Sequence, residues 1–260
     1  MRKIFYSFIL LFTFMPVLVT KAQEKDTLKV MSYNLRFGEL ATLEELATFI
    51  KSENPDVVAL QEVDVKTNRP AAKHQNGKDF ITELGYLTGM FSLYGKTIPY
   101  TGGYYGIGIL TKYPYISAER ILLNSPEGTK EQRAILISEI ELPDNSIITF
   151  ACTHLDHSTT TVRQAQVEHL NEVLQERNNP IIVCGDFNGH PNADEIKRGM
   201  QKWLNVGNET STFPAKNPRS TIDYIFCYPE NRWNVLDFWV PQVQLSDHLP
   251  IVSTLTLNKE

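Results

Sequence analysis

The chain contains little cysteine. Its three cysteines, Cys152, Cys184 and Cys227, are an odd number and cannot all be paired within one chain. Each lies inside an apolar run that is typical of a strand, so buried free thiols are the simplest interpretation. A disulfide between Cys152 and Cys184 stays open as the alternative in an oxidising compartment.

Basic residues are scarce relative to acidic ones. The 25 Lys and Arg residues and the 30 Asp and Glu residues give a formal net charge of −5. Loss of the first 22 residues, which include Arg2, Lys3 and Lys21, would lower this charge by three, to −8. Because nonspecific affinity for nucleic acid comes largely from neutralised phosphates, such a surface argues against strong nonspecific binding. A nuclease with a local basic rim is still compatible with this charge.

The long apolar run of the chain spans residues 4–19 and is interrupted by Pro16. Basic residues precede it and small residues precede a cleavage point after Ala22, as in a secretory signal peptide. The run is marginal for spanning about 30 Å of hydrocarbon, which disfavours an uncleaved anchor. No cysteine follows it to accept a lipid. We expect a signal peptide at residues 1–22 and a secreted or periplasmic protein with no stable membrane insertion after cleavage.

No repeat, low-complexity tract or linker rich in Gly, Ser or Pro divides residues 23–260, which fit one domain. A capping box of Thr42 and Glu45 marks the start of a helix at residues 43–53. Two more helices are predicted at residues 160–177 and at 193–204, the latter capped by Asn192. Strands are predicted at residues 28–33, 57–61, 105–111, 134–142, 147–153, 181–185, 221–228, 233–240 and 251–257. This order suggests two packed sheets flanked by helices.

Five polar motifs stand where apolar runs end. Adjacent strands lie about 5 Å apart, so carboxylates, amides and imidazoles at strand ends can meet at one mouth. This pattern is typical of a metal-centred active site. The motifs are Asn34, Gln61-Glu62, Thr153-His154, Gly185-Asp186-Phe187-Asn188 and Ser246-Asp247-His248.

Glu62 and Asn34 suit a hard cation. Glu62 follows an apolar run, where a carboxylate is costly unless it is exposed at the strand end or holds a cation. Asn34 also follows an apolar run and offers a neutral oxygen. Mg²⁺ prefers oxygen ligands. For either residue alone, a turn or cap position is the more common interpretation.

Asp186 and Asn188 share one side of an extended segment. The carboxylate can hold a metal or orient water, while the amide can donate to a phosphate oxygen as negative charge builds. An Asx turn that ends the strand is the alternative for this tetrapeptide taken alone.

Neither His154 nor His248 has a second histidine at helical metal-binding spacing, which disfavours zinc. His248 could act as a general acid or base if a second carboxylate fixed its tautomer. Asp223 lies in an apolar run and needs a partner, so it is the candidate for that carboxylate. For a single histidine, a hydrogen-bonded structural residue is the ordinary interpretation.

In this order the motifs resemble those of the endonuclease/exonuclease/phosphatase superfamily over residues 28–257. The resemblance implies an α/β fold like that of deoxyribonuclease I, a four-layered sandwich of two packed mixed sheets between helices. It also implies hydrolysis of phosphoesters by in-line attack of water, with Mg²⁺ as the cofactor and Mn²⁺ as its substitute. The motifs that match are Tyr33-Asn34, Leu60-Gln61-Glu62, Thr153-His154-Leu155-Asp156, Gly185-Asp186-Phe187-Asn188, Ile222-Asp223-Tyr224 and Ser246-Asp247-His248.

The same resemblance implies a metal site and a place within the superfamily. Glu62 would be the main Mg²⁺ ligand, with Asn34 beside it and Asp247 as a further ligand. Arg36 occupies the place where the abasic-site nucleases carry an acid, which argues against the DNA-repair branch. Residues 62–69 look more like the small secreted hydrolases and the sphingomyelinase and lipid-anchor remodelling branches.

Five residues take catalytic roles by the resemblance. His248, oriented by Asp223, would activate water or stabilise the phosphorane, and Asp186 would position or deprotonate the water. Asn188 would bind phosphate, and His154 would donate to the developing charge or the leaving group. The identity of the general base and the number of metal ions stay open.

Substrate contacts are expected in two loops. Basic residues after Glu62 could clamp a phosphate, or could belong to a solvated loop. Tyrosines among glycines near residue 100 could stack on a base or sugar, or pack the loop. The candidate contacts are Arg36, Arg69, Lys73 and Tyr105.

The prediction slightly favours a monomeric hydrolase of a small or lipid-linked phosphoester. A secreted scavenging nuclease shares every catalytic residue and acts on nucleic acid instead. A noncatalytic binding module on the same scaffold is the alternative from another class. Nucleic acid, phospholipid headgroup, inositol phosphate and nucleotide all stay open as substrates.

Overall fold

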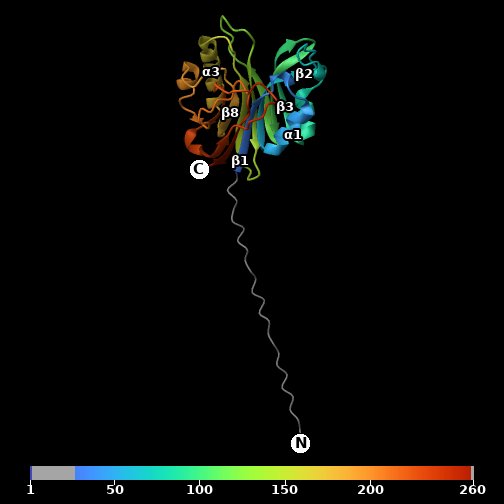
Figure 1. The fold of residues 1–260 in the computed structure, drawn as a ribbon. Helices are drawn as coiled ribbons and strands as arrows, with labels where there is room; N and C mark the ends of the chain where they lie inside the picture. Colours follow the sequence, from blue (N-terminus) through green and yellow to red (C-terminus); the bar gives the residue numbers. More distant parts are fainter. Residues whose placement is uncertain (2–26, 259–260) are drawn as a thin grey trace.

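Two β-sheets pack against each other in the computed structural model, which describes Met1 and residues 27–258 (Figure 1). Apart from Met1, the predicted signal peptide lies outside these described residues. Within the described part of the chain, no helix is long and apolar enough to cross a membrane.

The first sheet has six strands in the order β11-β12-β1-β2-β4-β3. The second also has six, in the order β5-β6-β7-β8-β10-β9. Each has a parallel pair at its centre, β1 with β2 and β7 with β8, and antiparallel strands outside it, which confirms the two mixed sheets. The strands of the first sheet are β1 (Thr27–Asn34), β2 (Val57–Val65), β3 (Phe91–Tyr100), β4 (Gly103–Thr111), β11 (Trp233–Trp239) and β12 (Ile251–Leu257). Those of the second are β5 (Tyr115–Leu122), β6 (Ala134–Glu141), β7 (Ile147–His154), β8 (Ile181–Asp186), β9 (Leu204–Asn205) and β10 (Asp223–Tyr228).

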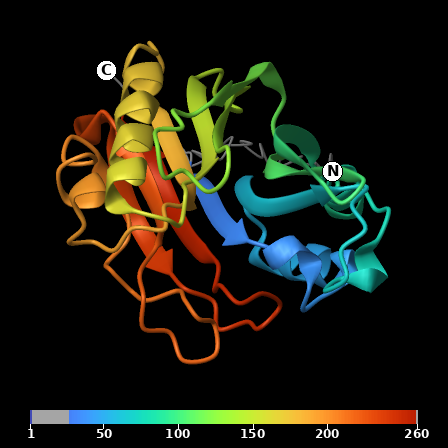
Figure 2. The same ribbon diagram turned by 90° about the horizontal axis from the view of Figure 1, so that it is seen from above.

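Helices cover the two outer faces. The first sheet is covered by α1 (Leu43–Glu53) and α2 (Phe80–Thr88), and the second by α3 (Thr160–Gln175) and α4 (Asp194–Lys197). Figure 2 shows α3 on one side of the paired sheets and the first two helices on the other. Three 3₁₀ turns, η1 (Arg36–Gly38), η2 (Lys73–Gln75) and η3 (Glu230–Arg232), lie in the connections. The order helix, sheet, sheet, helix confirms the four-layered sandwich.

The side chains of the central strands alternate between two apolar layers. On β1, Val30 packs between the sheets while Met31 packs under the helices, and on β8 Cys184 and Val183 divide in the same way. Successive strand residues point to opposite faces, and both faces of these strands are covered. The ends of the central strands are therefore the places where polar groups can reach solvent or a ligand.

All three cysteines have free thiols in the layer between the sheets. Cys152 and Cys184 are neighbours across β7 and β8, but no disulfide joins them. The structure therefore has the buried thiols that the apolar runs indicate, and not the alternative disulfide.

Two segments of the chain repeat one order of elements. The segment β1-α1-β2-α2-β3-β4 is followed later by β7-α3-β8-α4-β9-β10. Within its sheet, each segment arranges its four strands first, second, fourth, third. In both, a helix links the central parallel pair.

The predicted helix at 193–204 is wrong in its length. Only the single turn α4 forms; its N-cap is Ala193 and not Asn192, and it makes no side-chain cap hydrogen bond. The helix ends at Lys197, two residues before Gly199, a residue type that disfavours helix, and Leu204 pairs with β10 instead.

Besides β9 and the 3₁₀ turns, three elements were missed by the sequence pattern. Seven of the eight residues of β5 are exposed, so the strand shows no apolar alternation. The helix α2 contains Gly85, and β3 carries the Tyr94 and Tyr100 that the sequence assigns to a loop. In contrast, α1 and its Thr42–Glu45 capping box match the prediction residue by residue.

Candidate active site

The carboxyl ends of the two central parallel pairs meet at one edge of the sandwich. Asn34 ends β1 opposite Gln61 of β2, and His154 ends β7 opposite Asp186 of β8. Asp223 begins β10 and also lies opposite Asp186, because β10 runs antiparallel to β8. The strand register thus brings the polar motifs of both sheets together.

Gly185 allows the two strands of the second sheet to approach closely beside the site. A Cβ at this position would lie 2.0 Å from the Thr153 carbonyl oxygen, inside any allowed contact. Glycine is therefore required for the register that sets His154 beside Asp186.

A β-bulge aims the Glu62 side chain. The pairing of β2 with β4 shifts between Leu60 and Val63, and Glu62 has the left-handed φ of 58°. Bulges of this kind redirect a side chain near active sites. Burial raises the pKa of Glu62, and the nearby Asp247 carboxylate raises it further against the lowering effects of Asn34, His248 and Arg133.

The Asn34 side chain links the two sheets. Its buried amide nitrogen donates to Glu62 Oε1 at 3.2 Å and to Asp186 Oδ2 at 3.1 Å. Its oxygen accepts a hydrogen bond from the backbone N–H of Arg36 at 3.0 Å. Since Glu62 belongs to the first sheet and Asp186 to the second, Asn34 fixes their relative position.

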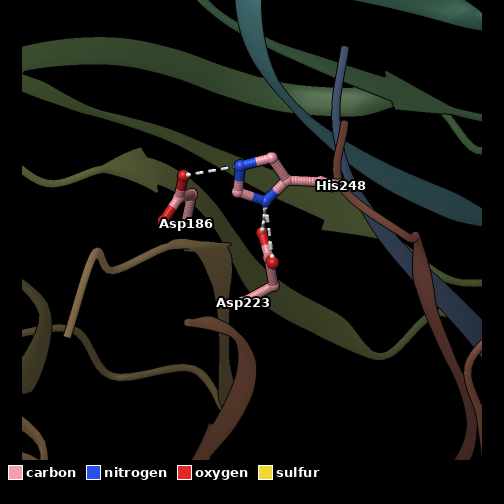
Figure 3. A group of neighbouring side chains, drawn as sticks. All are labelled: Asp186, Asp223 and His248. Atoms are coloured by element: carbon pink, nitrogen blue, oxygen red, sulfur yellow. Dashed lines mark hydrogen bonds and ion pairs between the residues drawn. The ribbon is translucent and has the colours of Figure 1, made fainter. Parts of the chain in front are cut away.

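The His248 imidazole lies between two buried carboxylates (Figure 3). Its Nδ1 is 2.9 Å from Asp223 Oδ2 and 3.2 Å from Oδ1, while Nε2 is 3.7 Å from Asp186 Oδ2. Thr212 Oγ1 donates to the same Asp223 Oδ2, so Asp223 is held from both sides. The structure thus brings Asp223 and His248 together as the predicted pair, and adds Thr212, which no sequence motif indicated.

Neighbouring charges and burial set the protonation of His248 and Asp186. Burial lowers the pKa of His248, but the Asp223 and Asp186 carboxylates outweigh it and raise the pKa to about 10. Burial raises the pKa of Asp186 to about 7 although the His248 charge opposes it. A cationic imidazole between two acids is therefore the expected resting state.

Asn188 is anchored in the turn that follows β8. Its backbone N–H donates to Asp186 Oδ1 at 2.8 Å, and its side-chain nitrogen donates to the Leu155 carbonyl at 3.0 Å. The first contact is the Asx turn that the tetrapeptide alone would suggest. Asn188 can therefore form the Asx turn and also contribute to the site, because the turn places its amide beside the Asp186 carboxylate.

His154 is buried and contacts an arginine that the sequence pattern did not identify. Its Nδ1 is 3.1 Å from Arg133 Nη1, and its Nε2 is 3.5 Å from Asp186 Oδ2. Burial and the Arg133 charge lower the pKa of His154 well below its usual range. The signal for Arg133 in the sequence is slight: a single arginine directly before the apolar run of β6.

Asp247 is held by Arg36 at the rim of the site. Arg36 Nη1 lies 2.5 Å from Asp247 Oδ2, and Arg36 Nε also contacts Glu39. Both partners are partly exposed, with 36% and 24% of the side-chain surface accessible. The structure therefore places the predicted substrate contact Arg36 against the predicted metal ligand Asp247.

Two sets of residues could hold a cation. Ligand atoms of Asp186, Asp223 and His248 lie within 4.8 Å of one another, but both His248 nitrogens already face carboxylates. Glu62, Asp247 and Asn34 offer oxygen atoms as ligands, and the Asp247 carboxylate is close enough to raise the pKa of Glu62. Mg²⁺ prefers oxygen ligands, so the second set fits it better.

The other predicted substrate contacts lie in β4 and in the loop that follows β2. Arg69 donates to both carboxylate oxygens of Asp64, and its guanidinium lies 4.2, 4.0 and 5.0 Å from the ring centres of Phe37, Tyr100 and Tyr105. The buried Asp64 and the rings fix this arginine in the loop after Glu62. Tyr105 is itself buried, and the exposed Lys73 begins η2.

Solved structures with the same architecture have low sequence identity to this chain. An endonuclease/exonuclease/phosphatase structure from Bacteroides vulgatus has a TM-score of 0.73 at 17% identity, covering 90% of this chain and 100% of that one. A mannosyl-6-phosphatase from Bacteroides thetaiotaomicron has a TM-score of 0.69 at 17% identity, covering 88% and 100%. At these identities the likeness shows the fold.

Sequence comparison identifies the family. A UPF0294 protein from Vibrio campbellii is 27% identical over 136 residues, which are 49% of this chain and 46% of that protein. The match thus spans less than half the length of this curated relative. A sequence model of the Endonuclease/Exonuclease/phosphatase family matches residues 31–248, a span that includes every predicted catalytic and metal-binding residue. The chain therefore belongs to the endonuclease/exonuclease/phosphatase family of enzymes that hydrolyse phosphoester bonds.

Proposed function

We propose that the protein is a secreted, Mg²⁺-dependent hydrolase of a small or lipid-linked phosphoester. The observation that carries this proposal is the buried Asp186 carboxylate, which faces Asn34, His154 and His248 from both sheets. Such preorganised groups stabilise the charge that develops when water attacks phosphorus. The mannosyl-6-phosphatase with the same fold supports a small phosphoester as the substrate.

Each side chain of the site has a separate role in the reaction. Asp186 orients the attacking water and accepts its proton while the water oxygen bonds to phosphorus and the bond to the leaving group breaks. His248, held by Asp223, and the Asn188 amide donate hydrogen bonds to the phosphoryl oxygens. Glu62, Asn34 and Asp247 would hold Mg²⁺, which supplies charge neutralisation and positioning of the phosphoryl group.

A substrate panel tests this proposal. Sugar phosphates, inositol phosphates, nucleotides, sphingomyelin and oligonucleotides would each be incubated with Mg²⁺ and, separately, with a chelator. We expect turnover of at least one nonpolymeric ester, abolished by the chelator. Absence of turnover on every ester at millimolar Mg²⁺ would favour the noncatalytic binding module.

A secreted nuclease is the second candidate because of one surface feature. Tyr100 and Tyr104 are exposed at the β3–β4 turn, and Lys96 Nζ lies 4.9 Å from the Tyr104 ring centre. Aromatic rings beside cationic groups bind single-stranded nucleic acid by stacking. If this candidate is right, Tyr104→Ala slows oligonucleotide turnover, turnover falls steeply with salt, and small esters are poor substrates.

Export and assembly are part of the same proposal. We expect the exported protein to begin at Gln23 after removal of the leader and to behave as a monomer. N-terminal sequencing of the protein from culture medium or periplasm checks the first point. Light scattering checks the second.

A further inference from the structure

We propose that Arg133 is a positioning residue that fixes His154 in the tautomer with its proton on Nε2. Only the expected effect of Arg133 on kcat rests on the proposed function. The tautomer itself follows from the contacts of two buried side chains. The group so prepared is a hydrogen-bond donor aimed at the reacting phosphate.

The direction of the contact between Arg133 and His154 is fixed by chemistry. A guanidinium carries five N–H donors and no acceptor, and it stays protonated in proteins. Because Arg133 Nη1 lies 3.1 Å from His154 Nδ1, the ring nitrogen must accept. A proton on Nδ1 would set two donors against each other at that distance. The neutral ring that satisfies this contact carries its proton on Nε2.

Arg133 has no freedom to turn away from this contact. It is 3% exposed, and its Nη1 also lies 3.0 Å from Glu131 Oε1. Its backbone carbonyl accepts from Leu123 N–H at 2.9 Å and from Gln132 Nε2 at 2.8 Å, just before β6. These contacts fix the origin of the side chain, and the neighbouring strand β7 fixes His154.

The Nε2–H of His154 faces the centre of the site. The Nε2 atom lies 3.5 Å from Asp186 Oδ2, the atom that also accepts a hydrogen bond from Asn34. A phosphoryl oxygen that enters beside Asp186 would meet this donor directly. His154 therefore stabilises the developing negative charge by a hydrogen bond, with no proton transferred to the leaving group.

Nitrogen NMR of the labelled protein tests the tautomer independently of any substrate. In a spectrum that correlates ring protons with ring nitrogens, we expect His154 Nδ1 to be unprotonated and Nε2 to be protonated at pH 7. The His154→Gln variant assigns the signals by their loss. A proton on Nδ1, alone or together with one on Nε2, overturns the proposal.

Substitutions of Arg133 test whether this residue fixes the tautomer of His154. Arg133→Met should release the tautomer and lower kcat by about tenfold with a smaller change in KM, since the lost contact serves the transition state. Arg133→Lys keeps a cationic donor and should restore part of kcat and the Nε2–H signal. An Arg133→Met spectrum identical to that of the wild type overturns the proposal.

Arg163→Met is the matched control. Arg163 is also a buried arginine paired with an acid, Glu195, but it belongs to α3 on the outer face of the second sheet and, among the described residues, makes no hydrogen bond with His154. This variant should lose stability while the His154 spectrum and kcat stay unchanged. If Arg133→Met does not fold, the wild-type spectrum still decides. If the wild type turns over no ester but shows the expected tautomer, the proposed function fails and the assignment of the tautomer stands.

Discussion

Individual side chains of the site depend on one another for their charge. Glu62 is half-buried near a second carboxylate, and two acids raise the pKa of His248 above its usual value. Removal of one member therefore leaves others unpaired in a buried place, which costs more than the lost contact alone.

His248→Ala and Glu62→Ala should each lower turnover by at least about a hundredfold, as loss of an acid–base or metal-binding group does. Steady-state rates on the best ester of the panel measure this. The exposed His74→Ala and Glu172→Ala are the controls and should leave the rate unchanged. A near-normal rate in either site variant would contradict the assignment of the site.

Arg36→Gln should raise the affinity for Mg²⁺. Arg36 competes with a cation for Asp247, and a partly exposed ion pair contributes about 1 kcal/mol or less, which corresponds to up to about fivefold in affinity. Calorimetric titration with Mg²⁺ in the absence of substrate measures the change. Arg198→Gln, which removes the surface pair with Asp194, should have no effect. A weaker affinity in Arg36→Gln would show that the arginine helps to build the metal site.

The helices and strands of the fold differ in how clearly their own residues predict them. The helix α1 and the strand β12 match the predicted ranges because each has the local signal that its structure requires. The edge strand β5 is defined by its pairing with β6, which is a tertiary contact, and its exposed side chains give no period. Arg133 was missed for a similar reason, since its partner His154 is 21 residues away and on another strand.

Asp156 joins the loop before β6 to the turn before α3 and makes this contact sensitive to pH. Its carboxylate accepts from the N–H groups of Lys130 and Glu131, at 3.1 and 3.0 Å, and of Ser158, at 2.8 Å. Burial raises the pKa of Asp156, but these hydrogen bonds outweigh it and lower the pKa below the ordinary 3.8. The charged form thus stabilises the native state above that pH, and its contribution is lost as the pH falls through the lowered pKa.

Asp156→Asn should reduce the free energy of unfolding by about 1–3 kcal/mol at pH 7, because a charged acceptor of three N–H groups is lost. The difference from the wild type should shrink as the pH falls below 3.8. Urea unfolding at pH 7 and near pH 3 measures both values. Asp194→Asn, at a position whose side chain is 43% accessible, should change stability by less than about 0.5 kcal/mol. An equal loss at both pH values would show that the charge is not the cause.

At the scale of the whole molecule, the layer between the sheets excludes solvent from all three thiols. Burial raises the pKa of Cys152 to about 12 and holds those of Cys184 and Cys227 well above their usual range. Thiolate is the reactive form, so these cysteines should be inert while the sandwich is intact.

A thiol reagent should modify none of the three cysteines in the native protein and all three in concentrated urea without reductant. Absorbance of the released thiolate counts them. Only one reactive thiol in urea would show that a disulfide had formed in the exported protein. Rapid modification of the native protein would instead show that the two sheets separate readily.

The matched order of elements in the two sheets has an evolutionary consequence. Duplication and fusion of a gene for one βαβαββ unit would produce β1-α1-β2-α2-β3-β4 and β7-α3-β8-α4-β9-β10 within one chain. The equivalent strand ends now carry different residues, Asn34 against His154 and Gln61 against Asp186. Neither unit alone contains the full constellation. On this account the phosphoesterase chemistry arose only after the copies were joined, and their later divergence erased the repeat from the sequence.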